Sequence, residues 1–278
     1  MEITLQCRDA YGIPGWDGAV EIEPFRLDQI KRIAGARSTA SLFRKLIKVL
    51  SGANSPVSLP AGLAVADLDL GDFMQILVAL SAASRARQVK KVYECPHCKK
   101  DQPRVIDILS VFVPVAPEII GGQKVIDFGN GTQAVCRYTR VRDYLDVKDA
   151  VESIKAKSIG DSGQLDLSKV RERYGKIFSF EDEDDLTDFC ALLDDVGALA
   201  LRTEIGDMSF DDKLGWIFSV QDDADRDAYK ELVRTMHGLS ATMQNDYVST
   251  CTNCKQEFSA KFEATDYFFD FQWVSSKD

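Results

Sequence analysis

The chain has 278 residues and a formal net charge of −10, with 45% hydrophobic and 28% charged residues. This composition is typical of a globular protein, and the length allows one large domain or two smaller ones with a sizeable core. The acidic charge argues against binding to nucleic acid or anionic lipid, and since no apolar run approaches ~18 residues, the sequence predicts no membrane span.

Glycine and proline interrupt the first 60 residues, and we predict an N-terminal extension or arm with short helices over residues 1–60. Residues 1–6 lack the basic and apolar pattern of a signal peptide, which favours an intracellular protein. The helix predicted over residues 41–50 carries Arg44, Lys45 and Lys48 beside an apolar stripe. This helix either docks on a partner or presents an ordinary solvated face.

Residues 61–278 are predicted to form a main body of the α+β class. An almost wholly apolar helix from Asp69 to about Arg87 is expected at the centre of a core. Further strands and helices follow, including a β-hairpin, a large helical insertion of about residues 141–240 and an aromatic end that packs on its own core or on a neighbour. The predicted strands are 111–115, 124–128 and 133–138, the helices are 141–157, 183–202, 211–219 and 223–237, and the aromatic end is 267–273.

Two acidic runs, Glu181–Asp185 and Asp222–Asp225, begin predicted helices. Calcium binding is one interpretation, but neither run has the central glycine and spaced ligands of an EF-hand. Acidic side chains in the first turn also suit the helix dipole. The sequence therefore favours helix starts over calcium sites.

Seven cysteines are present, and four of them form two C-x-x-C pairs. The odd number and the intracellular character favour free thiols over disulfides. Each pair lies in a predicted turn between strands, and two such turns supply the four sulfur ligands of a closed tetrahedral Zn²⁺ site. We therefore predict one structural Zn²⁺ per chain in a discontinuous zinc ribbon, built from residues 88–110 and 246–265. The predicted ligands are Cys95, Cys98, Cys251 and Cys254, with 152 residues between Cys98 and Cys251.

Other interpretations of these pairs remain open. A redox C-x-x-C pair opens a helix, whereas these pairs lie between strands, and free thiols without metal are the third alternative. His97 lies inside the first turn, where its ring is expected to point outward rather than bind the ion. His237 ends a predicted helix as a partner of the helix dipole. The isolated Cys7, Cys136 and Cys190 are expected to be buried fillers.

The common catalytic sequence motifs do not occur in this chain. There is no P-loop, dinucleotide fingerprint, nucleophile elbow or H-E-x-x-H, and only two histidines. Four thiolates complete the coordination of a zinc ion and leave no position for a reactive water. The sequence therefore predicts no enzyme, no catalytic residues and no cofactor other than Zn²⁺.

The order of these motifs resembles a known family over residues 66–278. A strand leads to Cys95-Pro96-His97-Cys98, a helical segment contains Ile205-Gly206-Asp207 and Gly238-Leu239-Ser240, and Cys251-Thr252-Asn253-Cys254 precedes a strand that reaches Asp266-Tyr267-Phe268-Phe269. This arrangement is similar to the baseplate hub and hub-assembly proteins of T4-type phages with contractile tails. The resemblance implies a metal site formed by two C-x-x-C turns, with a helical insertion between them.

The resemblance further implies a structural or assembly component of a contractile tail baseplate, acting through protein–protein interfaces in a multi-subunit assembly. Its partners would be other baseplate and tail proteins. The protein would be located in the baseplate of the virion tail, and in the host cytoplasm during assembly. The alternative is a zinc-ribbon regulator that binds nucleic acid through a local basic patch. The candidate patch consists of Lys90, Lys91, Lys99, Lys100 and Lys255.

Overall fold

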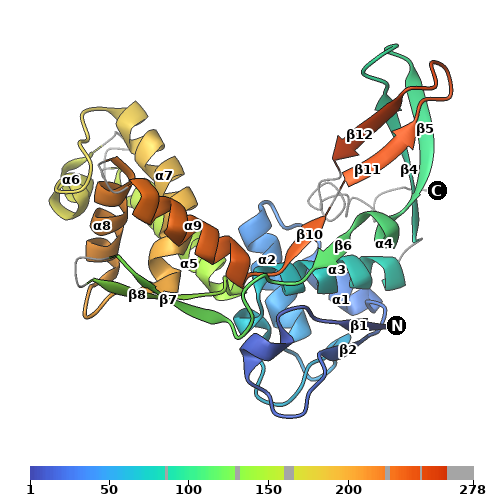
Figure 1. Cartoon of the computed structure of the whole chain (residues 1–278), viewed down its shortest axis with the longest axis horizontal. Coiled ribbons are helices and arrows are strands. Elements are labelled where there is room, and N and C mark those ends of the chain that lie inside the picture. Colours follow the sequence, from blue (N-terminus) through green and yellow to red (C-terminus); the bar gives the residue numbers. More distant parts are fainter. Residues whose placement is uncertain (85–86, 129–131, 160–165, 223–225, 245, 262–278) are drawn as a thin grey trace. The chain divides into compact units, whose positions relative to one another are not determined.

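The computed structural model describes residues 1–84, 87–128, 132–159, 166–222, 226–244 and 246–261 (Figure 1). The chain divides into two compact units, of which the second, residues 117–240, is inserted into the first. Every strand pair among the described residues is antiparallel, and helices occur in both units. This mixture is compatible with the predicted α+β class.

The first unit begins with a small sheet of order β1-β2-β3, and α3 contacts β2 of this sheet. Ser38 caps α2, since its hydroxyl oxygen accepts a hydrogen bond from the Ser41 N–H at 3.2 Å. Asp69 caps α3 in the same way, accepting from the Gly71 N–H at 2.9 Å. The elements are β1 (Glu2–Thr4), η1 (Arg8–Tyr11), β2 (Ala19–Ile22), α1 (Leu27–Ile33), α2 (Thr39–Leu50), β3 (Val57–Ser58), η2 (Val65–Asp67) and α3 (Leu70–Ser84).

The predicted N-terminal extension packs against the helices that follow it. Residues 1–60 belong to the same compact unit as α3. Leu46 is buried, and the ring of Phe43 on α2 packs edge-on against Phe73 on α3, with centroids 5.1 Å apart. The apolar stripe of α2 therefore lies in the core of its own unit. The basic side chains beside it flank that core, as Lys45 does by donating to the Ala34 carbonyl at 2.9 Å.

Two hairpins and a connecting strand pair complete the first unit. Strands β6 and β10 pair where the chain leaves the unit and where it returns, with Val115 opposite Thr242. The strand predicted over residues 111–115 is wrong in its first part, because Asp107 accepts from the Leu109 N–H at 3.0 Å and starts a short helix there. The elements are β4 (Gln88–Glu94), β5 (Asp101–Asp107), α4 (Ile108–Val111), β6 (Val113–Val115), β10 (Thr242–Gln244), β11 (Asp246–Thr250) and β12 (Glu257–Lys261).

The second unit consists of helices and a sheet of order β7-β8-β9. It includes the hairpin β7–β8 as well as the helices of the predicted insertion, since β8 pairs with β9 after α7. The predicted helices 141–157 and 183–202 are confirmed to the residue, and α6 was not predicted. The elements are β7 (Gln123–Asp127), β8 (Gln133–Arg137), α5 (Val141–Lys157), α6 (Ser168–Tyr174), α7 (Glu183–Arg202), β9 (Thr203–Glu204), α8 (Phe210–Asp222) and α9 (Arg226–Leu239).

Charged groups organise both the start of α7 and the interior of the second unit. Asp182 accepts from the N–H groups of Asp184 and Asp185, so the acidic run begins a helix as predicted. In the interior, Arg137 makes a bidentate ion pair with the buried Asp143, at 2.6 and 2.8 Å. The same guanidinium donates to the Leu201 carbonyl at 3.0 Å. This pair joins β8, α5 and the end of α7.

Some predictions fall outside the described residues. The hairpin turn at residues 129–131 and the aromatic end at 267–273 are two of them, although β7 and β8 pair in register on either side of that turn. None of the described helices is both long enough and apolar enough to cross a membrane.

A buried carboxylate network holds the first unit together. Asp72 accepts from the backbone N–H groups of Gln6 and Cys7, at 2.7 and 2.9 Å, and from the Tyr11 hydroxyl at 2.7 Å. Asp69 accepts from the N–H of Ala241, at 3.1 Å, where the chain returns from the insertion. Burial raises the pKa of Asp72, and the three donors oppose that rise. The network therefore joins the N-terminus, the start of α3 and the returning chain.

We predict that Asp72→Ala destabilises the protein by about 3 kcal/mol, because it leaves buried donors without an acceptor. Tyr11→Phe removes one hydroxyl of the same network and should cost about 1 kcal/mol. The exposed Asp9→Ala is the matched control and should leave the free energy of unfolding unchanged. Urea unfolding of the three variants measures these differences, and equal stability of Asp72→Ala and Asp9→Ala would contradict the role assigned to the network.

Candidate metal centre

The two C-x-x-C turns have the same backbone geometry. In the first, the Cys95 N–H donates to the Lys100 carbonyl at 3.0 Å, and the Lys99 N–H donates to the Cys95 carbonyl at 2.8 Å. In the second, the corresponding bonds run from Cys251 to Gln256 at 2.9 Å and from Lys255 to Cys251 at 3.1 Å. Each turn joins the two strands of one hairpin, β4 to β5 and β11 to β12. The chain thus builds one local structure twice.

A left-handed residue closes each turn. Lys99 has a φ of 58° and Lys255 a φ of 62°, and they are the non-glycine residues with positive φ in the described part of the chain. A side chain in this conformation costs roughly 1 kcal/mol, so both turns retain a strained residue at the same position. Such strain clusters at binding sites. The repeated lysine after each second cysteine is the sequence signal of this shared geometry.

The turns bring four thiols together. Cys95 and Cys251 are fully buried, whereas Cys98 and Cys254 are half-buried. The sulfur–sulfur distance is 3.7 Å between Cys95 and Cys254 and 3.6 Å between Cys98 and Cys251, and all four sulfurs lie within 4.8 Å of one another. Four sulfurs around an ion at about 2.3 Å are separated by about 3.8 Å, whereas a disulfide needs about 2.05 Å. The spacing therefore matches ligands of one ion.

Backbone donors favour the charged form of two of the four sulfurs, whereas at Cys254 the backbone donor is outweighed by burial and the other thiols of the cluster, which raise its pKa to about 11. Burial raises the pKa of the Cys251 thiol, but the N–H groups of Cys254 and Asn253, at 3.5 and 3.4 Å, help to lower it to about 6. The Lys100 N–H likewise lowers the pKa of Cys98. Because the thiolate is the form that binds metal, these donors favour cation binding at Cys98 and Cys251.

Polar side chains fasten the two hairpins beside the thiols. The buried Gln102 side chain of β5 accepts from both the N–H and the hydroxyl of Thr252, each at 2.9 Å. Arg104 donates to the Ser249 hydroxyl at 2.9 Å and to the Thr250 carbonyl at 2.7 Å. These contacts cross between segments about 150 positions apart in the chain. Their signal in the sequence is weak, because a Gln and an Arg in an alternating strand are also typical of a solvated face.

Apolar contacts complete the joint between the hairpins. The rings of Tyr93 and Tyr247 stack with centroids 5.7 Å apart, and Phe258 is buried with Cys95 and Cys251. These side chains exclude water from one side of the thiol cluster. The thiols thus lie at one end of a small two-hairpin core.

The two histidines lie apart from the sulfur cluster, as expected. His97 is exposed, and its Nε2 lies 3.2 Å from the Glu257 carbonyl oxygen, so the ring contacts the second hairpin. His237 lies exposed in the last turn of α9.

The remaining cysteines are buried and separate, as predicted. Burial raises the pKa of Cys7, Cys136 and Cys190 above the usual range of a thiol. Among the described residues, the four clustered cysteines form the group that could hold a metal ion.

No family model, curated protein or solved structure matches this chain.

We predict that Gln102→Ala destabilises the two-hairpin joint by about 1–2 kcal/mol, because the N–H and the hydroxyl of Thr252 both lose their acceptor. The exposed Gln123→Ala in the second unit is the matched control and should have no effect. Hydrogen exchange of the Thr252 amide reports the local change. Unchanged protection of this amide in Gln102→Ala would contradict the assigned contact.

Proposed function

We propose that the four cysteines bind one structural Zn²⁺ and that the two hairpins form a discontinuous zinc ribbon. The donor set supports zinc, since four thiolates at tetrahedral spacing suit a soft cation that needs no open position. A redox pair has less support, because each C-x-x-C lies between two strands rather than at the start of a helix.

The ion would act as a cross-link between distant parts of the chain. Cys98 and Cys251 are separated by 152 residues, most of which form the inserted unit. Zinc binding in such a site contributes directly to folding, because the ligands come together only in the folded state. The hairpins alone offer a small core with few buried apolar side chains. We infer that zinc supplies much of their stability.

Freshly purified protein is predicted to contain about one zinc per chain, measured by elemental analysis. Cys251→Ser should lose most of the metal and lower the melting temperature, since it removes a ligand from the closed set. Cys190→Ser changes a buried thiol of the second unit instead and should retain the zinc. Absence of metal from the unmodified protein, or full zinc content in Cys251→Ser, would contradict the proposal.

We further propose that the protein is a structural or assembly component of a contractile phage tail baseplate. The resemblance in motif order over residues 66–278 carries this proposal, and the paired turns around a helical insertion support it. A site closed by four thiolates stabilises rather than catalyses. Function would then lie in the protein surfaces that contact other baseplate and tail proteins.

Binding to nucleic acid, the alternative, has less support. Lys99 pairs with Glu94 at 3.4 Å, and Arg104 is committed to contacts between the hairpins. Residues 1–116 and 241–278, which include the ribbon, carry 18 basic and 18 acidic side chains and so have no net positive charge. A phosphate-binding surface needs an excess of basic groups.

The baseplate proposal predicts that the protein crosslinks to tail or baseplate proteins in infected cells or in purified virions. Cys251→Ser should reduce these crosslinks, whereas Cys190→Ser should preserve them, because only the former disturbs the proposed zinc site. Crosslinking with mass spectrometry of both fractions is the measurement. Association with DNA that weakens steeply with salt, without crosslinks to tail proteins, would overturn the proposal in favour of the regulator.

A further inference from the structure

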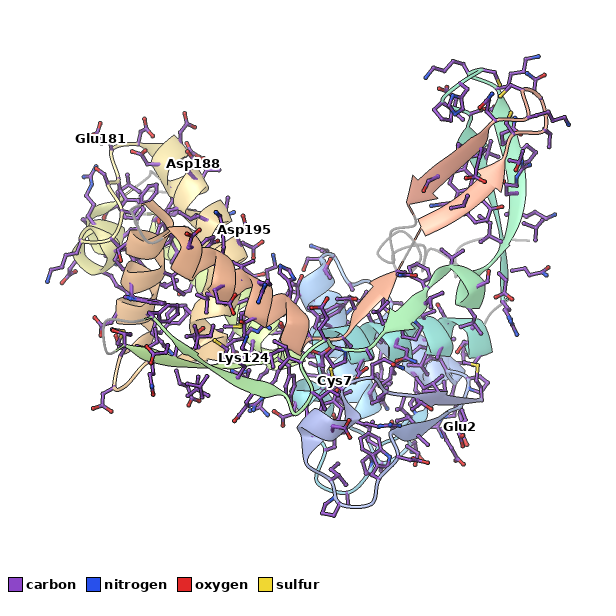
Figure 2. The ribbon with its side chains drawn as sticks, viewed as in Figure 1. Glu2, Cys7, Lys124, Glu181, Asp188 and Asp195 are labelled. Atoms are coloured by element: carbon purple, nitrogen blue, oxygen red, sulfur yellow. The ribbon has the colours of Figure 1, made fainter. Side chains whose placement is uncertain are left out.

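The net charge of the protein lies entirely in the inserted unit. Residues 117–240 contain 26 Asp and Glu against 16 Lys and Arg, a net charge of −10, whereas the rest of the chain is balanced. Figure 2 labels three of the acidic residues, Glu181, Asp188 and Asp195, in the region of α7. The electrostatic field of this unit therefore favours a basic partner.

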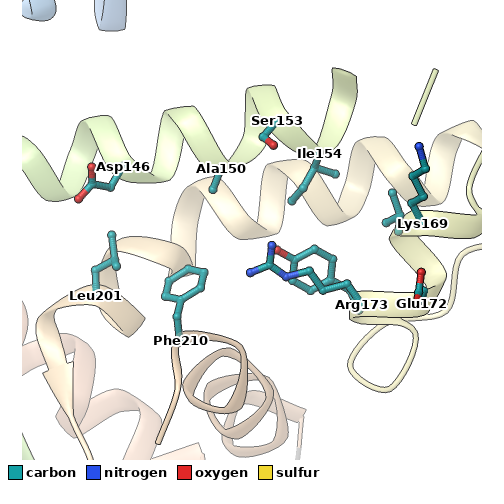
Figure 3. A pocket seen from close by; sticks show the side chains of 11 residues that line it. Asp146, Ala150, Ser153, Ile154, Lys169, Glu172, Arg173, Leu201 and Phe210 are labelled. Carbon is teal, nitrogen blue, oxygen red and sulfur yellow. The ribbon is translucent and has the colours of Figure 1, made fainter. Parts of the chain in front are cut away.

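The same unit contains an open cavity of about 500 Å³. This volume lies in the range of ligand-binding sites. One wall is a face of α5 on which Asp146, Ala150 and Ser153 follow one another at helical spacing (Figure 3). Leu201 and Phe210, both half-buried, face this helix from the end of α7 and the start of α8.

The interior of the cavity is apolar. Ile154, Val170 and Tyr174 are almost completely buried and form part of its lining. The half-buried Leu201 and Phe210 leave apolar surface exposed beside them, and this surface gains free energy when another apolar group covers it. The cavity can therefore accept an apolar side chain.

The charged side chains at the rim of the cavity differ in whether they form ion pairs. Arg173 makes a bidentate ion pair with Asp211, at 2.9 and 3.1 Å, and its guanidinium also lies over the ring of Tyr174. Lys169 and Glu172 lie near each other at one end (Figure 3). Asp146 lies at the other end, near Leu201, and makes no hydrogen bond or ion pair with the described residues. Lys169 and Glu172 likewise make no hydrogen bond or ion pair with the described residues, so Asp146 is distinguished by its place beside the apolar Leu201.

The surroundings of Asp146 favour an added cation. Partial burial and the nearby carboxylates of Asp143 and Asp149 raise the pKa of Asp146, while Arg142 and Arg137 oppose that rise. A positive group placed beside Asp146 would relieve this repulsion between carboxylates.

We propose that this cavity is a docking site for an amphipathic basic segment of a partner protein. A bulky apolar side chain of the segment enters between Ala150, Leu201 and Phe210, and a Lys or Arg one helical turn away pairs with Asp146. Helices commonly dock in grooves through such anchors at spacings of three or four residues. The negative charge of the whole unit increases the rate of encounter with a basic segment. The inference is independent of the zinc site and of the baseplate.

The test uses the full-length protein and a fluorescent synthetic peptide of leucine and lysine at helical spacing, with glutamine elsewhere. A second peptide carries glutamate in place of lysine, and a third carries alanine in place of leucine. Fluorescence anisotropy should show binding of the first peptide. The other two peptides should bind at least tenfold more weakly, because each lacks one type of anchoring side chain. In methyl-labelled protein, the first peptide should shift the Ile154 and Leu201 signals and leave Ile47 of the first unit unchanged.

Two charge-reversal variants separate the cavity from the general field. Asp146→Lys should weaken binding of the first peptide about tenfold or more, because it places like charges together. Asp188→Lys, an exposed position on α7 outside the cavity, changes the net charge equally and should alter binding by less than about twofold. Ala150→Phe fills the cavity and should abolish binding, with melting temperatures confirming that all three variants are folded.

Several results would overturn the proposal. Equal weakening by Asp146→Lys and Asp188→Lys would assign binding to net charge alone. Equal binding of the glutamate peptide, unshifted Ile154 and Leu201 signals, or no binding up to about 1 mM peptide would exclude the site.

Discussion

The meeting of two cysteine pairs separated by 152 residues is the constraint on which this architecture depends. Each pair lies in a turn that its own hairpin forms locally, so the chain has only to bring two prepared turns together. Buried Gln102 and the stacked Tyr93 and Tyr247 align the hairpins, and the sulfurs then lie at the spacing of ligands around one ion. The segment between the pairs must therefore leave and return at neighbouring points. Strands β6 and β10 satisfy this requirement, because they pair where the insertion begins and ends.

A second set of contacts, made by carboxylates, also holds together the parts of the chain on either side of the insertion. Asp69 and Asp72 begin α3, and both use their carboxylates to hold segments far away in the sequence. Close approach is essential there, since a Cβ at Gly71 would lie 2.0 Å from the Ala241 carbonyl oxygen. Buried carboxylates are stable only with enough donors, and Asp72 has three. The returning chain is thus held by backbone contacts and polar contacts before it reaches the second cysteine pair.

The two units differ in what they offer to other molecules. The first has balanced charge and carries the four-cysteine cluster, whereas the second carries the whole net charge of −10 and an open apolar cavity. In the second unit the Arg137–Asp143 pair lies in the interior, so its charges hold the fold, and Asp146 on the same helix remains at the surface.

Local patterns in the sequence were sufficient to predict two long helices and the two cysteine pairs. Helical periodicity placed α5 and α7 at their observed bounds, and spacing alone singled out Cys95, Cys98, Cys251 and Cys254. Both depend on residues within one turn or one helix, where neighbours in sequence are neighbours in space. The seven-residue α6 lacks enough turns for a periodic signal and was missed.

Only the tertiary structure decided which segments share a core. Residues 1–60 read as an extension because glycine and proline suppress local patterns, yet Phe43 packs on Phe73 and closes the first unit. The same holds for Gln102, whose alternation in a strand suggests a solvent-facing residue until Thr252 covers it from 150 positions away. Such contacts depend on chain closure, which no local window contains. The sequence by itself therefore determined the bounds of α5 and α7, the two C-x-x-C turns and the grouping of their four cysteines. The packing of distant segments determined the units, the contacts between the hairpins and the cavity.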